Sequence, residues 1–153
     1  MRKRLFLTAL ALGTAAFAAG RADLAGTWQL DPSRSDSGEE KLKGETLDIK
    51  QMEDAVQVAD ALIEADGKER KSDVQCNTLG KECKLRGEQV TVYYNGNALV
   101  IMETLPKDVV VKRRLEATDD GRTLNMRLTR LAPSGEKIEN YTFTRQPAST
   151  AKR

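Results

Sequence analysis

The chain has 153 residues, a formal charge of +2, 39% hydrophobic residues and 5% aromatic residues. This length suits one domain with one hydrophobic core, and no internal repeat, low-complexity block or proline-rich linker divides the chain. Lysine and arginine are interleaved with aspartate and glutamate rather than clustered with aromatic residues, which argues against nucleic acid as a partner.

The N-terminus has the pattern of a secretory signal peptide. Basic residues 2–4 precede an apolar stretch over residues 5–18, which ends in the small-x-small sequence Ala16-Phe17-Ala18. Polar residues at 20–23 end the stretch before it reaches the roughly 20 apolar residues that a membrane span needs. We therefore expect cleavage after Ala18 and a mature protein without a membrane span, free in the periplasm or outside the cell.

Cleavage would also change the charge of the chain. The leader carries three basic residues and no acidic one, so its removal lowers the formal charge from +2 to −1 and leaves about 135 residues. The calculated basic isoelectric point is then mostly a property of the leader. The mature chain gives no indication of a surface that binds polyanions.

From Leu24 onward the sequence has the pattern of successive β-strands. Runs with alternating or continuously apolar side chains are separated by turn residues such as Asp66-Gly67 and Asn95-Gly96-Asn97. Short connections between successive runs predict antiparallel neighbours. The runs, of which that at 83–86 is the weakest, are approximately 24–31, 45–52, 55–63, 69–76, 83–86, 89–94, 98–104, 109–117, 123–131 and 137–145.

A meander of this length leaves two unprotected edges unless its first strand pairs with its last. We therefore predict an all-β fold, an antiparallel up-and-down β-barrel of eight to ten strands; closure requires an even number, and eight and ten both remain open. The long connection over 32–44 would lie across one mouth, where a lid would be. Outside the barrel domain, which is predicted over 24–146, we expect a signal peptide at 1–18, an N-terminal tail at 19–23 and a disordered C-terminal tail at 147–153.

Cys76 and Cys83 are the two cysteines of the chain, and Gly80 lies among the six residues between them. In an oxidising compartment we expect a structural disulfide across the base of a hairpin, which would contribute roughly 2.5 kcal/mol by restricting the unfolded chain. A zinc site is less compatible because the chain has no histidine, and a redox pair would have the tighter Cys-x-x-Cys spacing. We expect no metal and no cofactor.

The alternation of the terminal strands predicts which side chains face inward. Trp28 and Leu30 share one face of the first strand, while Tyr141, Phe143 and Arg145 share one face of the last. If the barrel closes, these faces meet and Arg145 lies near Trp28. A guanidinium over an indole ring contributes about 0.5 to 2 kcal/mol, so this pair would form a structural plug at the closed end.

These residues carry a resemblance to a known group of proteins. Gly26-Thr27-Trp28 at the start of the first strand, with Arg145 at the end of the last, resembles the lipocalin signature of a Gly-x-Trp tryptophan covered by a late arginine. The longer sequence over 26–35 resembles the start of exported bacterial lipocalin-like (calycin-type) proteins, most of which have no assigned function. The chain departs from the better-known lipocalins because it has no clear Thr-Asp-Tyr triplet near its middle and no pattern for a C-terminal helix.

The alternation over 109–117 directs Arg113 inward together with Leu115. A charge in an apolar lumen needs a partner, and the resemblance to fatty-acid carriers with internal arginines implies a ligand carboxylate. Alternatively, a bulge would shift the alternation, and Arg113 would pair with Glu103 or with solvent at the rim. The residues that we single out as candidates for ligand binding are Arg113, Tyr141, Met126, Ile101 and Tyr94.

The sequence argues against an enzyme. There is no histidine, no Gly-x-Ser-x-Gly turn and no glycine loop that would hold a phosphate. Two functions remain: a binder of a small apolar or amphipathic ligand in the lumen, or a non-enzymatic envelope module with a filled lumen, which meets another protein through strand 98–104 or the long loop. The identity of a ligand or of a protein partner does not follow from the sequence.

Overall fold

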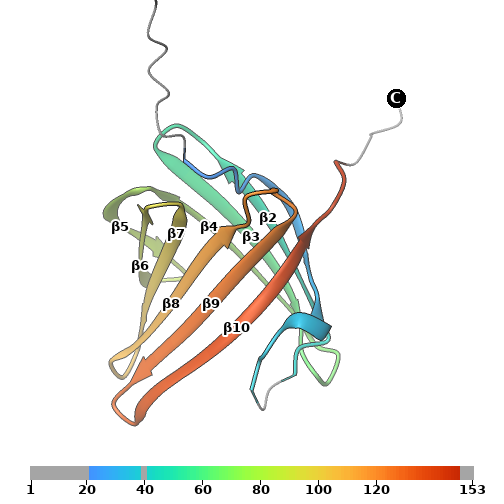
Figure 1. The fold of residues 1–153 in the computed structure, drawn as a ribbon. Helices are drawn as coiled ribbons and strands as arrows, with labels where there is room; N and C mark the ends of the chain where they lie inside the picture. The colour runs from blue at the N-terminus through green and yellow to red at the C-terminus, as the bar shows by residue number, and fades with distance from the viewer. Residues whose placement is uncertain (1–20, 39–40, 149–153) are drawn as a thin grey trace, which may run out of the picture.

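The structure, a computed structural model, describes residues 21–38 and 41–148, so the predicted signal peptide and the end of the predicted C-terminal tail lie outside the described residues. Ten antiparallel strands form a single sheet that curls into a barrel (Figure 1). The strands are β1 (Gly26–Leu30), β2 (Gly44–Gln51), β3 (Ala55–Ile63), β4 (Glu69–Asn77), β5 (Leu79–Leu85), β6 (Glu88–Asn95), β7 (Ala98–Leu105), β8 (Val109–Ala117), β9 (Thr123–Ala132) and β10 (Gly135–Arg145).

The first strand pairs with the last, as the sequence predicts. In the order β4-β3-β2-β1-β10-β9-β8-β7-β6-β5, β1 lies between β2 and β10, and Trp28 is opposite Arg145. The weakest run, at 83–86, belongs to a true strand, β5, so the count is ten. The all-β up-and-down fold is confirmed, although the barrel is nearly closed rather than closed because β4 and β5 remain as the two edges of the sheet.

The disulfide forms between the predicted cysteines, but its setting differs from the expected hairpin. Cys76 on β4 is bonded to Cys83 on β5. These strands follow one another along the chain yet form opposite edges of the sheet, so the bond connects the two edges across the remaining gap. The spacing indicated a hairpin because the two cysteines lie close together along the chain. Although a single residue, Thr78, joins the two strands, they form no ladder with each other, and β5 pairs with β6 instead.

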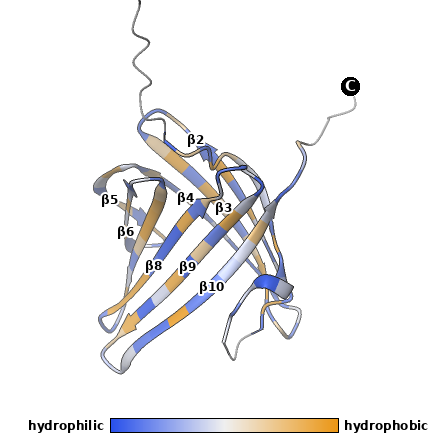
Figure 2. Ribbon diagram, viewed as in Figure 1, coloured by the Kyte–Doolittle hydropathy of each residue, from blue (hydrophilic) through white to orange (hydrophobic). Residues whose placement is uncertain are grey.

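Alternation along each strand separates the core from the surface, as the hydropathy colours in Figure 2 show. One buried cluster forms the core. It includes the residues of the two terminal strands that the alternation assigns to the interior, apart from Gly26 and Arg145. The cluster consists of Leu24, Trp28, Leu30, Leu47, Ile49, Val56, Val58, Val74, Cys76, Val90, Val92, Leu99, Ile101, Leu115, Leu124, Met126, Tyr141 and Phe143.

Strand β7 is buried on both faces over part of its length, so its first half lacks the exposed apolar face that the interaction-module alternative would use. Ala98 and Val100 point away from the lumen and are nevertheless fully buried. The register places Val100 between Tyr93 on β6 and Arg114 on β8, whose long side chains share its outer face. This half of the strand therefore offers no free apolar surface to a partner.

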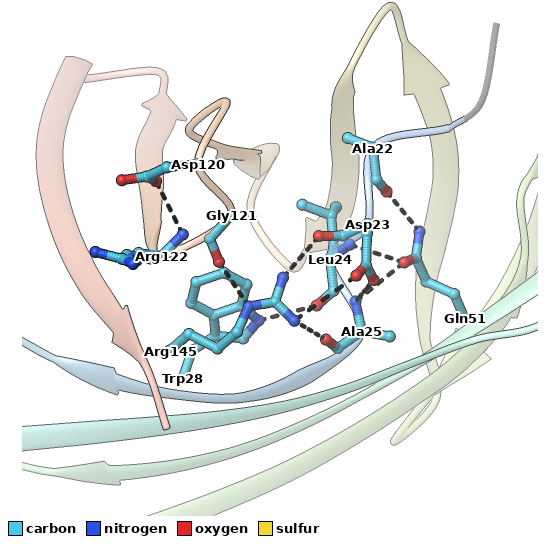
Figure 3. A network of polar contacts seen from close by, with 10 residues as sticks. All are labelled: Ala22, Asp23, Leu24, Ala25, Trp28, Gln51, Asp120, Gly121, Arg122 and Arg145. Atoms are coloured by element: carbon cyan, nitrogen blue, oxygen red, sulfur yellow. Dashed lines mark hydrogen bonds and ion pairs between the residues drawn. The ribbon is translucent and has the colours of Figure 1, made fainter. Parts of the chain in front are cut away.

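The closed end of the barrel is organised around Arg145 (Figure 3). Its guanidinium carbon lies 4.3 Å from the centre of the Trp28 ring. Its three nitrogens donate hydrogen bonds to the backbone carbonyls of Ala25 at 2.6 Å, Gly121 at 2.7 Å and Asp23 at 2.9 Å. Arg145 therefore ties the chain before β1 and the β8–β9 turn to the end of β10, and it shields the indole from solvent.

The backbone conformation at residue 26 explains why the Gly-x-Trp motif needs its glycine. Gly26 has φ of +127°, and a Cβ there would lie 3.3 Å from an Arg145 nitrogen, so a side chain would be strained and would also press on the guanidinium. The resulting bend lets the Trp28 indole N–H donate to the Leu24 carbonyl at 2.9 Å. The buried indole thus has both a hydrogen-bond partner and a cation over its face.

Replacing Trp28 with alanine should lower the free energy of unfolding by about 3 to 5 kcal/mol, because it leaves a large cavity and removes the ring beneath the Arg145 guanidinium. Urea unfolding should be followed by circular dichroism, since the variant lacks the only tryptophan. Leu131→Ala, at an exposed position, is the control and should change stability by under about 0.5 kcal/mol. A Trp28→Ala loss as small as that of the control would contradict the plug.

The double variant Cys76→Ser/Cys83→Ser should lose roughly 2.5 kcal/mol of unfolding free energy, since it removes the restriction on the unfolded chain. Urea titrations with and without a reductant measure the effect. Reductant should destabilise the wild-type protein by a similar amount and leave the double variant unchanged. Equal stability of oxidised and reduced wild type would show that the bond between the sheet edges contributes nothing.

Candidate ligand-binding site

The described residues of the connection between β1 and β2, 31–38 and 41–43, form what we call the lid segment. Its first half is attached to β10: the Asp31 N–H donates to the Thr142 carbonyl at 2.8 Å, and Asp36 pairs with Asn140 as an isolated bridge. The Ser35 hydroxyl also accepts a hydrogen bond from the Thr142 N–H at 2.9 Å. These contacts extend the β1–β10 pairing beyond Leu30, so the segment leaves the barrel wall only after Asp36.

The second half of the lid segment lies at the mouth of the barrel, as the sequence predicts. It encloses a hollow of about 280 Å³ against Leu30 and Tyr141, whose side chains face inward. Leu42, near the end of the segment, is partly buried and packs against the core. On the lid side the hollow is lined by Pro32, Ser35, Asp36, Ser37, Gly38, Lys41 and Leu42.

Below this hollow an ion pair crosses the lumen. Arg113 on β8 lies in register with the inward-facing Ile101 and Leu128, and its Nη1 atom is 3.4 Å from Asp60 Oδ2 on β3. Strands β3 and β8 are separated in the sheet by β2, β1, β10 and β9, so the pair joins opposite walls. Both side chains are largely buried, with exposed fractions of 13% for Arg113 and 15% for Asp60.

A second carboxyl group, Glu45 on β2, lies beside this ion pair with an exposed fraction of 5%. Burial and then the charge of Asp60 raise the pKa of Glu45 to about 8, against the opposing effect of Arg113. At neutral pH the Glu45 carboxyl is therefore neutral and donates a hydrogen bond to Asp60. We refer to Glu45, Asp60 and Arg113 as the charged cluster.

Asp60 is the carboxyl group of the cluster that Arg113 contacts. Its pKa is raised, because the effect of burial outweighs the opposing effects of the Arg113 charge and of the hydrogen bond with Glu45. Its Oδ1 atom is buried without a fixed hydrogen-bond donor. The cluster thus holds one guanidinium for two carboxyl groups.

Glu139 on β10 adds a polar group at the edge of the mouth, with an exposed fraction of 8%. Its Oε2 atom accepts a hydrogen bond from the Tyr141 hydroxyl at 3.0 Å, and its Oε1 atom lies 2.9 Å from the Lys137 ammonium. Gly38 of the lid segment is close to both Lys137 and Glu139. The lid therefore rests on a polar rim, whereas the apolar side of Tyr141 faces the hollow.

The structure brings together most of the residues that the sequence singled out for ligand binding. Ile101 is the register partner of Arg113, and Met126 is the partner of Tyr141, so these four line the wall from β7 to β10. Tyr94 lies apart, toward the closed end, where its hydroxyl accepts a hydrogen bond from Gln51 Nε2 at 2.8 Å. A role of these residues in binding stays a prediction.

Sequence reasoning did not identify the partner of Arg113. Glu103 on β7 was the alternative considered, but the guanidinium meets Asp60 from the opposite wall. Glu45, Asp60 and Glu139 were all missed as interior residues. The alternation contained the necessary pattern, because each lies two residues from a member of the buried cluster on the same strand: Leu47, Val58 and Tyr141.

A larger hollow, of about 640 Å³, lies elsewhere and includes Asp60 of the charged cluster in its lining. Most of its lining comes from outward-facing residues of β2, β3 and β4, including Thr46, Ala59 and Ala61, together with the β5–β6 turn. Arg86 of that turn donates a hydrogen bond to the Lys71 carbonyl on β4, across the gap between the sheet edges. We place the candidate site under the lid segment because the segment and the inward-facing Leu30 and Tyr141 enclose the hollow there.

Two further observations concern the part of the chain that the structure describes. Over residues 21–38 and 41–148, no helix has the length and apolar character needed to cross a membrane. Over the same ranges, no three aspartate, glutamate, cysteine or histidine side chains gather in an arrangement that could hold a metal ion.

Solved structures share the architecture of this chain. A REP1-NXSQ fatty acid transporter superimposes with a TM-score of 0.59 at 18% identity, over 83% of this chain and 98% of its own. Zebrafish ileal bile acid-binding protein, complexed with cholic acid, gives 0.55 at 16% identity, over 80% and 98%. Lipid binding protein 8 of Caenorhabditis elegans gives 0.54 at 9% identity, over 80% and 94%. These similarities show the fold.

No protein-family model matches the chain, and no curated protein is significantly similar to it in sequence.

The raised pKa of Glu45 predicts how stability depends on pH. The folded state holds this proton up to about pH 8, whereas an unfolded glutamate releases it near pH 4.5. The contribution of Glu45 to the free energy of unfolding is therefore highest below pH 4.5 and decreases as the pH rises from 4.5 to 8. We expect a loss on the order of 2 kcal/mol between pH 5 and pH 8. Urea unfolding at several pH values measures it.

The variant Glu45→Gln should remove most of this loss, because glutamine cannot ionise. Glu103→Gln, an inward-facing acid outside the charged cluster, is the matched control and should retain the wild-type pH dependence. If the free energy of unfolding depends on pH in the same way in Glu45→Gln and in the wild-type protein, Glu45 does not hold its proton in the folded state.

Proposed function

We propose that the protein binds a small apolar or amphipathic molecule between the lid segment and the lumen, without catalysing a reaction. The observation that carries this proposal is the hollow of about 280 Å³ in which the lid segment covers Leu30 and Tyr141. Ligand sites combine an apolar lining with a few polar groups that fix orientation. Here the apolar lining comes from Leu30, Leu42 and Tyr141, and the polar groups come from the lid segment, with Asp36 and Lys41 as its charged members.

The shared fold supports this proposal. A fatty acid transporter and a bile acid-binding protein complexed with cholic acid have the same barrel architecture, at 18% and 16% identity. A small up-and-down barrel with inward-facing residues is suited to a single small ligand, because its interior is just wide enough to hold one.

We also propose that the protein is exported, as the resemblance to exported bacterial lipocalin-like proteins implies, and acts in the periplasm or outside the cell. The N-terminal sequence supports this location through its basic residues, its apolar stretch and its small-x-small site. The Cys76–Cys83 disulfide supports it as well, since such bonds persist in oxidising compartments.

A second candidate is the envelope interaction module with a filled lumen. The observation that favours it is the packing of the lower lumen, where the buried cluster extends from Trp28 and Phe143 up to Ile101, and the Arg113–Asp60 pair crosses above it. Under this alternative the ion pair has a purely structural role and the hollow under the lid contains only solvent.

Native mass spectrometry of the protein purified from its own host should reveal a co-purifying small molecule. A panel of fatty acids and isoprenoids should then contain compounds that raise the melting temperature by about 5 °C at saturation. Leu42→Trp should abolish this shift by filling the hollow, whereas Leu131→Trp, on the exposed surface, should retain it. Absence of both a bound mass and any shift would favour the interaction module.

A further inference from the structure

The outer wall of the barrel at β8, β9 and β10 combines cations with exposed apolar side chains. The register aligns the outward-facing residues of these strands in three successive rows that run across the wall. From the mouth toward the closed end, the rows contain Val110 and Leu131, then Lys112 and Ile138, then Arg114 and Arg127, which we together call the basic face.

The cations of the basic face outnumber the acids around them. Arg114 is directly opposite Arg127, and like charges in that arrangement destabilise a sheet. Arg114 has one ion pair, at 3.4 Å to Glu116. In the part of the chain that the structure describes, neither Lys112 nor Arg127 has a carboxylate within ion-pair distance. The neighbouring residues therefore leave positive charge on this face without compensation.

The opposite outer wall, formed by β2, β3 and β4, has a different balance of charge. Its cations Lys50 and Lys71 lie among the acids Asp48 and Asp73, and Lys71 is also paired with Glu69 at 3.2 Å. The formal charge of the whole chain is only +2. The excess of positive charge on the basic face is thus a local property of one side of the barrel.

The apolar members of the basic face lie next to one another at its mouth side. Leu131 and Ile138 have exposed fractions of 44% and 41%. Leu131 is opposite Val110 on β8 and opposite Glu136 on β10, so Ile138 is its diagonal neighbour. Exposed apolar side chains that adjoin one another are typical of surfaces that bind a protein or a membrane.

We infer that the basic face docks on the surface of an anionic phospholipid membrane. Lys112, Arg114 and Arg127 would contact lipid phosphates, while Leu131 and Ile138 enter the interface between head groups and acyl chains. Both kinds of contact strengthen binding to anionic bilayers, because attraction to the lipid charge adds to the burial of apolar area. The inference goes beyond the proposed function, since it does not depend on whether the lumen holds a ligand.

The shape of the basic face favours a bilayer over an acidic peptide. The face is the convex outer side of a barrel, and its residues line neither of the two hollows described above. Strands β8, β9 and β10 are each paired on both sides, so they offer no edge to which a peptide strand could add. Long lysine and arginine side chains can instead reach separate head groups across a lipid surface.

Co-sedimentation of the purified protein with vesicles tests the inference. Vesicles of equal parts phosphatidylcholine and phosphatidylglycerol should bind about a hundredfold more tightly than phosphatidylcholine alone, because each of three cations contributes about fivefold. Raising the ionic strength from about 0.1 M to about 1 M should remove most of this preference, since salt screens the charges.

The double variant Lys112→Gln/Arg127→Gln should bind the mixed vesicles about 25-fold more weakly, because it lacks two of the three cations. Lys50→Gln/Lys71→Gln removes the same charge from the opposite wall; it is the matched control and should bind like the wild-type protein. Because Arg127→Gln also relieves the repulsion from Arg114, thermal melting should show that the first variant is at least as stable as the wild-type protein.

The double variant Leu131→Ser/Ile138→Ser tests the apolar contact and should bind the mixed vesicles about tenfold more weakly. Unchanged affinity of this variant, equal binding of the wild-type protein to both kinds of vesicle, or the same loss in the two charge variants would overturn the inference. Failure of the wild-type protein to bind the mixed vesicles would overturn it as well, and the basic face would then fit an acidic protein surface.

Discussion

The pairing of β1 with β10 is the constraint on which the rest of the structure depends. It brings Trp28 under Arg145, and the guanidinium then connects three separate backbone segments at the closed end through Ala25, Gly121 and Asp23. Because β1 also pairs with β2, this contact joins the β2–β4 part of the sheet to the β5–β10 part. Without it, the two parts would have no common interior, and no site could form between their walls.

The interior that results has two levels with different chemistry. Near the closed end the side chains are apolar and fully buried, with Trp28 and Phe143 as the largest. Toward the mouth, the inward positions of the same strands carry Glu45, Asp60, Arg113 and Glu139. Each strand continues its alternation from the closed end to the mouth. The inward-facing side chains therefore change from apolar to charged with their distance from the closed end.

The two openings of the barrel are held by different means. The disulfide and the Arg86 side chain connect the sheet edges at β4 and β5, so the gap between them is restrained covalently and by a hydrogen bond. The mouth is covered by the lid segment, whose first half is anchored on β10 and whose second half rests on Leu42 and the polar rim. The lid segment is therefore held by non-covalent contacts alone.

The sequence by itself determined the strands, their antiparallel order, the contact of Trp28 with Arg145 and the bonded cysteines, because alternation, turn residues and motif spacing are local properties that every strand shows. Only the tertiary structure decided that Asp60 faces Arg113, that Glu45 retains its proton, and that the disulfide connects two sheet edges. Alternation gives the face on which a residue lies, but not which residue of the opposite wall reaches the same height. That depends on the register and curvature of all ten strands together.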